Sequence, residues 1–129
     1  MRRPVHFEIH ADDPERASAF YSAVFGWRIE KWAGPADYWL ITTGPDGEPG
    51  INGGILRRQG PPPAPGAPVH GYVCMTEVPA LDDTIEAASG AGGTVALPRM
   101  PVPGVGWLAY LEDTEGNLFG VLEPDANAG

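Results

Sequence analysis

The sequence has one cysteine, no long apolar run and few cationic side chains, and each shortage excludes a class of protein. A lone cysteine, Cys74, rules out an internal disulfide and a cysteine-rich metal site. It stands in an apolar run, where we expect it to be a small buried residue. No apolar run approaches the roughly 20 residues that cross a membrane, and no signal peptide is visible. We therefore expect a cytoplasmic protein with no membrane partner.

Cationic residues are outnumbered by acidic ones. Eight Lys and Arg stand against 17 Asp and Glu, which gives a formal net charge of -9. This acidity argues against nucleic acid or an anionic membrane surface as the partner. The length of 129 residues fits a single domain, and a hydrophobic content of 43% is enough for a core. The sequence shows no Ser-His-Asp or Cys-His arrangement and no phosphate-binding loop.

The first functional candidate is a strand followed by a helix. Residues 5–10 alternate strictly between apolar and polar side chains, as a half-buried strand does. The apolar members are Val5, Phe7 and Ile9, and the polar members are His6, Glu8 and His10. Residues 14–25 then show helical spacing, with Asp12 or Asp13 as the N-cap and Gly26 as the end. One face of the strand should pack on the helix, and the polar face is then free for function.

The remaining chain repeats this pattern. Further strands are expected at residues 27–32, 38–43, 51–56, 71–78, 94–96, 106–111 and 118–122, and Pro79 should open a second helix. Pro79 lies 65 residues after Pro14, and the turn at residues 112–116 lies 69 residues after the turn at residues 43–47. Both halves thus read βαβββ, which indicates a duplicated module.

A proline-rich stretch separates the two modules. Residues 59–68 hold too many prolines for a helix or a central strand. They could form an SH3-type ligand, but a semi-rigid spacer is favoured because they lie midway along the repeat. We expect one domain over residues 1–129, with modules at residues 1–58 and 69–129.

Three features together resemble the vicinal oxygen chelate superfamily. They are the two βαβββ modules, the segment Asp-Asp-Pro-Glu-Arg-Ala-x-x-Phe-Tyr at residues 12–21, and Asp-Thr-Glu-Gly-Asn-Leu-Phe-Gly at residues 113–120. This family includes glyoxalase I, extradiol dioxygenases, methylmalonyl-CoA epimerase and the bleomycin-resistance proteins. The resemblance covers nearly the whole chain. It implies an α+β fold in which two curved sheets, with their helices outside, enclose a cup. It does not select an activity, because the fold hosts many.

The resemblance also raises the question of a metal. The family's enzymes hold a divalent cation with His, Gln or Glu side chains from four strands. Carried onto this sequence, those positions fall on His6, on Gly53 or Gly54, on or next to Val73, and on Gly120. Glycine and valine side chains cannot bind a metal. We therefore expect neither a metal nor another cofactor.

A rearranged metal site is the alternative. The side chains of His6, Glu8 and His10 are strung over roughly 13 Å of one strand, so they could not reach one ion without help from other strands. The residues that could help are His70, Glu77 and Glu112.

Aromatic residues suggest a binding pocket. The rings on predicted strands are Trp32, Tyr38, Trp39 and Trp107, and the 69-residue repeat makes Tyr38 and Trp107 equivalent. The helices already offer Phe20, Phe25, Leu81 and Ile85 to cover the outer sheet faces, which should leave some of these rings for the inner face. We expect the four rings, together with His6, Glu8 and His10, to contact a ligand.

The sequence thus predicts a metal-independent, small-molecule-binding protein of the glyoxalase or bleomycin-resistance type. Its ligand should be bulky and planar or apolar, such as an antibiotic that it sequesters. The alternative is an enzyme: a lyase, isomerase or dioxygenase that uses a rearranged metal site, or metal-free acid–base chemistry by Glu8 with His6 or His10. A homodimer is expected, because two modules leave sheet edges to cover and family members commonly complete the pocket with a partner chain.

Overall fold

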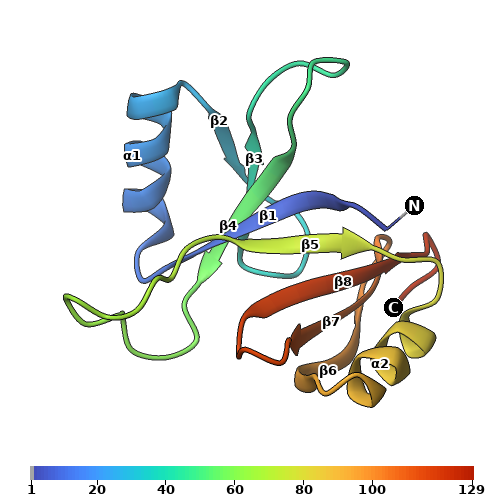
Figure 1. Cartoon of the computed structure of the whole chain (residues 1–129). Helices are drawn as coiled ribbons and strands as arrows, with labels where there is room; N and C mark the ends of the chain where they lie inside the picture. Colours follow the sequence, from blue (N-terminus) through green and yellow to red (C-terminus); the bar gives the residue numbers. More distant parts are fainter. Residues whose placement is uncertain (1) are drawn as a thin grey trace. The chain divides into compact units, whose positions relative to one another are not determined.

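The computed structural model describes residues 2–129 and belongs to the α+β class. The chain divides into two compact units. The first comprises His6–Tyr72, and the second comprises Val73–Gly129 together with residues 2–5. Each unit carries one helix and four strands in the order βαβββ, as the repeat predicted (Figure 1).

The first unit forms a four-stranded sheet with one helix. Its elements are β1 (Pro4–Ala11), α1 (Pro14–Phe25), β2 (Arg28–Lys31), β3 (Tyr38–Thr42) and β4 (Asn52–Arg57). The strand order is β2-β3-β4-β1, with β1 parallel to β4 and the other pairs antiparallel. Asp13 caps α1 by accepting the Arg16 backbone N–H at 3.1 Å, and Gly26 ends the helix with φ of 71°. Both predicted helix boundaries are confirmed.

The second unit repeats this arrangement. Its elements are β5 (Val73–Glu77), α2 (Leu81–Gly90), β6 (Thr94–Val102), β7 (Gly106–Glu112) and β8 (Leu118–Pro124), in the sheet order β5-β8-β7-β6. Strand β6 is longer than predicted, because Pro98 and Pro101 lie in an edge strand, where a missing N–H is tolerated. Helix α2 begins at Leu81 rather than at Pro79, with Ala80 as its N-cap.

Each unit has its own apolar core between its helix and its sheet. The first core contains Phe7, Ile9, Ala11, Trp39, Ile41 and Ile55, with Ala17 and Tyr21 of α1 packed against it. The second contains Val78, Leu81, Ala109, Leu111 and Val121, with Ile85 and Ala88 of α2 packed against it. The apolar face of β1 therefore meets the helix, as the alternation predicted.

Two expectations about burial are wrong. Phe20 and Phe25 are each 58% exposed and do not cover the sheet; Ala17 and Tyr21 of α1 do so instead. Cys74 is exposed rather than buried, because it alternates along β5 with the buried side chains of Val73 and Met75.

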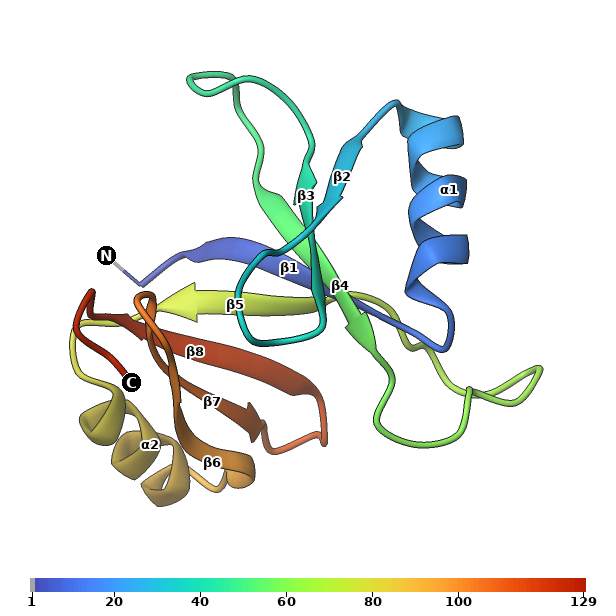
Figure 2. The same ribbon diagram turned by 180° about the vertical axis from the view of Figure 1, so that it is seen from behind.

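The connection between the units has no regular structure. Residues 58–72 contain neither helix nor strand and run as an open loop in both views (Figures 1 and 2). The predicted spacer, residues 59–68, lies within this stretch. Within residues 2–129, no helix combines the length and the apolar character needed to cross a membrane.

The alternation of β3 gives a direct test of the first core. Trp39 is 4% exposed within the core, whereas its neighbour Leu40 is 43% exposed. We expect Trp39→Ala to lower the free energy of unfolding by about 3–5 kcal/mol. Leu40→Ala, the matched control, should lower it by less than about 1 kcal/mol. Urea denaturation measures both changes, and a larger loss for Leu40→Ala would mean that the face assignment is wrong.

Candidate functional site

The polar face of β1 carries a buried carboxylate. Glu8 is 6% exposed, and it is the one charged residue in the buried class among residues 2–129. Its neighbours Phe7 and Ile9 belong to the core, so the alternation of the strand turns Glu8 away from α1. In the parallel β1–β4 pair, Glu8 lies opposite Gly54. A carboxylate in such a position needs hydrogen-bond donors.

The hydroxyl of Tyr38 joins Glu8 to His6. It donates to Glu8 Oε2 at 3.0 Å, and it lies 2.7 Å from His6 Nε2. The imidazole and phenol rings are close to parallel, at 18°, with centroids 6.3 Å apart. These three residues come from β1 and β3 and form what we call the His6–Tyr38–Glu8 cluster.

The directions of these hydrogen bonds follow from the proton count. A phenol has one proton, and Glu8 accepts it, so Tyr38 must accept the proton of the other bond from His6 Nε2–H. Burial lowers the pKa of His6, and the nearby Glu8 carboxylate raises it by a smaller amount. The imidazole is therefore neutral at pH 7 and carries its single N–H on Nε2.

Gly54 provides the space for the phenol. A Cβ at this position would collide with the ring and hydroxyl of Tyr38, so the ring lies directly against the backbone of β4. A close approach of this kind requires glycine. Gly53 faces the other way, since a Cβ there would meet Phe7 in the core.

His10 lies on the same face of β1 but outside the cluster. Its Nε2 atom is buried and makes no hydrogen bond to any part of residues 2–129, while its carbonyl accepts from Arg58 at 3.1 Å. The structure thus brings together two of the three predicted polar residues.

The metal-binding positions of the resembled family do not fit a metal here. In the first unit, Tyr38 fills the space beside Gly54 and occupies His6 Nε2. In the second unit, the sulfur of Met75 fills the space beside Gly120. Across residues 2–129, no three His, Cys, Asp or Glu side chains gather where one ion could bind. The chemistry that the first unit offers is hydrogen bonding and proton exchange.

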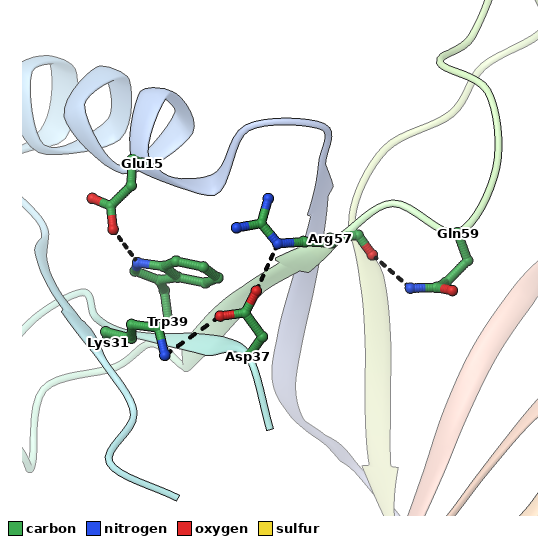
Figure 3. Close-up of polar contacts among 6 residues, drawn as sticks. All are labelled: Glu15, Lys31, Asp37, Trp39, Arg57 and Gln59. Atoms are coloured by element: carbon green, nitrogen blue, oxygen red, sulfur yellow. Dashed lines mark hydrogen bonds and ion pairs between the residues drawn. The ribbon is translucent and has the colours of Figure 1, made fainter. Parts of the chain in front are cut away.

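Trp39 does not lie on the functional face, and its predicted placement is wrong. Its ring belongs to the core, and its Nε1–H donates to Glu15 of α1 at 3.0 Å (Figure 3). Lys31 and Arg57 lie over the ring at 5.5 and 5.6 Å from its centroid. The expectation failed because the alternation of β3 turns Trp39, like Ile41, toward the core.

The predicted placement of Trp107 on the ligand-binding face is also wrong. It packs against the second core, donates to Asp125 at 3.1 Å, and has Arg99 over its ring at 4.4 Å. The pairs Leu40–Gly54 and Tyr110–Gly120 show that β3 and β7 correspond with an offset of 70 residues, not 69. A shift of one residue moves a side chain to the opposite face of a sheet.

The two other predicted rings differ in their surroundings. Trp32 lies just after β2, half-buried, with its ring over Gly34 and its backbone N–H bonded to the Tyr38 carbonyl at 2.8 Å. Tyr38 lies on the polar face, as predicted. Its hydroxyl also takes part in the site, through the hydrogen bonds to His6 and Glu8. The sequence held a signal for this: a tyrosine at the start of one strand and a glycine in the next.

Comparisons with known proteins agree with the resemblance. Residues 3–44 match the family model described as bleomycin resistance protein-like N-terminal. CFP32 of Mycobacterium bovis, a candidate glyoxylase by name, is 36% identical over 119 residues, which cover 91% of this chain and 42% of that protein. The anthracycline biosynthesis protein DauV of Streptomyces sp. (strain C5) is 28% identical over 130 residues, with coverages of 92% and 46%. The chain thus spans less than half the length of these curated relatives.

Solved structures give the same fold. Methylmalonyl-CoA epimerase from Mycobacterium tuberculosis superposes with a TM-score of 0.63 at 14% identity, over 95% of this chain and 87% of that one. At this identity the likeness shows the fold alone, and the predicted fold is confirmed. Together with the family model and the glyoxylase-named relative, it indicates the vicinal oxygen chelate superfamily, in agreement with the resemblance.

Proposed function

We propose that this protein binds a planar small molecule without a metal ion, as the sequestering members of its superfamily do. The observation that carries the proposal is the His6–Tyr38–Glu8 cluster, which holds polar groups at a largely buried point on the face opposite the core. Such a site fixes the orientation of a ligand through a few hydrogen bonds. The anthracycline name of DauV supports a planar polyketide as the ligand class. The biological role would be sequestration, for example of an antibiotic in the cytoplasm.

The second candidate is a metal-free acid–base enzyme that uses the same cluster. Hydrogen bonds connect a neutral imidazole through a phenol to a carboxylate, and such a chain can pass a proton. His6 would take a proton from the substrate, and Glu8 would stabilise the resulting imidazolium through Tyr38. His10 has no place in this chain.

The first prediction of the proposed function concerns the ligand. An anthracycline should bind to the wild-type protein, and Glu8→Leu should weaken binding roughly ten- to a hundredfold, because a hydrogen bond to a charged group is worth about 1.5–3 kcal/mol. Trp107→Phe, the control, should change affinity less than about twofold, since that ring packs against the second core. Calorimetry measures the affinities.

Two outcomes would decide against this assignment. If Trp107→Phe weakens binding and Glu8→Leu does not, the ligand binds away from the His6–Tyr38–Glu8 cluster. Chromatography of the ligand recovered from the complex separates the two candidates: an unchanged ligand supports binding, and a converted one supports the enzyme.

The second prediction concerns metal content. Because Tyr38 and Met75 fill two of the family's ligand positions, the purified protein should hold no stoichiometric divalent cation after mild dialysis. Elemental analysis provides the measurement. About one Zn, Ni, Mn or Fe per chain, lost in His6→Ala, would contradict the proposal.

The third prediction is a homodimer. The chain covers 42% of CFP32, so two copies together approach the length of that relative. A dimer would supply from a second copy what the longer relative carries in one chain. Light scattering behind size exclusion should give twice 13.7 kDa at micromolar concentration. A mass near 13.7 kDa would exclude the dimer at that concentration.

A further inference from the structure

We propose that His6 and Glu8 form a recognition site for a phenolic hydroxyl, and that Tyr38 is an exchangeable occupant of this site supplied by the chain itself. This inference deepens the proposed function and rests on it: it names the chemical group by which the planar ligand would be held.

The two partners select a neutral hydroxyl. His6 Nε2–H needs an acceptor, and Glu8 Oε2 needs a donor, and both point at one oxygen, 2.7 and 3.0 Å away. A carbonyl or an ether can accept from His6 but has no proton for Glu8. A carboxylate would be repelled by the buried charge of Glu8, and an ammonium could not accept from His6. A hydroxyl satisfies both partners.

The space around that oxygen selects a flat ring. Because Gly54 has no side chain, the aromatic ring of Tyr38 lies against bare backbone of β4. Gly54 is also the residue opposite Glu8 in the β1–β4 pair, so the flat surface lies directly beside the carboxylate. A hydroxyl attached to an aromatic ring therefore fits this site as a whole, and Tyr38 shows the fit.

The position of Tyr38 allows the exchange. It is the first residue of β3, is half-buried, and follows the irregular residues 32–37. Its backbone is held separately, through the bond from Trp32 N–H to its carbonyl. Rotation about χ1 could thus remove the side chain without breaking the strand. An incoming phenol would restore both hydrogen bonds that Tyr38 gives up.

The test compares naphthol with its methyl ether, which keeps the flat ring but cannot donate to Glu8. Tyr38→Val, which removes the occupant and retains a strand-forming residue, should bind naphthol at least tenfold tighter than wild type does. It should also prefer naphthol to the ether at least tenfold, and the double variant Tyr38→Val/Glu8→Leu should lose that preference. Tyr72→Val, which removes an exposed tyrosine that stacks on Phe7 on the face of β1 opposite the cluster, is the matched control and should bind naphthol as wild type does.

Three results would overturn the proposal. They are equal naphthol binding by wild type and Tyr38→Val, no preference over the ether in Tyr38→Val, and no binding to wild type at the solubility limit of naphthol. If Tyr38→Val does not fold, Tyr38→Phe takes its place. It should bind naphthol several-fold tighter than wild type, because the phenylalanine ring makes neither of the two hydrogen bonds to His6 and Glu8. Unchanged affinity would overturn the proposal. If an anthracycline fails to bind but the naphthol preference holds, the proposed function falls and the hydroxyl site stands; the reverse result removes only the hydroxyl site.

Discussion

A carboxylate cannot be buried without donors, and this constraint explains the first unit of the chain. Glu8 is 6% exposed, and the phenol of Tyr38 is one of the groups that meet its need. For the phenol to reach Glu8, the residue opposite on β4 must lack a side chain, which Gly54 satisfies. Once the phenol has given its proton to Glu8, it accepts from His6, and this fixes the tautomer of the imidazole. One buried carboxylate thus accounts for Tyr38 and Gly54 and for the tautomer of His6.

Local patterns in the sequence predicted the elements well, because they depend on near neighbours. Asp13 caps the N-terminus of the first helix and Gly26 caps its C-terminus, as capping chemistry predicts. The face of each aromatic ring depends instead on strand register, which the sequence leaves open by one residue. The offset of 69 residues was correct for the turns but not for β3 and β7, so Trp107 was assigned to the wrong face. The partnership of Tyr38 with Glu8 could not be predicted either, since it joins residues 30 positions apart.

The two units keep one architecture but differ in chemistry at matching positions. Glu8 pairs with Gly54 in the first unit, and Met75 pairs with Gly120 in the second. Tyr38 fills the space beside the first glycine, and Met75 itself fills the space beside the second. The duplicated module therefore carries a polar cluster in one copy and a flexible thioether in the other. In both copies a tryptophan on the helix side donates a hydrogen bond to a carboxylate and lies under a cation, although the two rings do not occupy equivalent positions.

The prolines of β6 have a consequence for how chains can assemble. Strand β6 ends the sheet order of the second unit, and Pro98 and Pro101 deprive it of two amide protons, while register shifts interrupt its pairing with β7. Strand β2, at the edge of the first unit's sheet, is four residues long and carries Arg28, Glu30 and Lys31. Short, charged or proline-bearing edges resist the addition of a strand from another molecule. Neither strand therefore favours the addition of a strand from another molecule, and amyloid-like stacking is disfavoured at both.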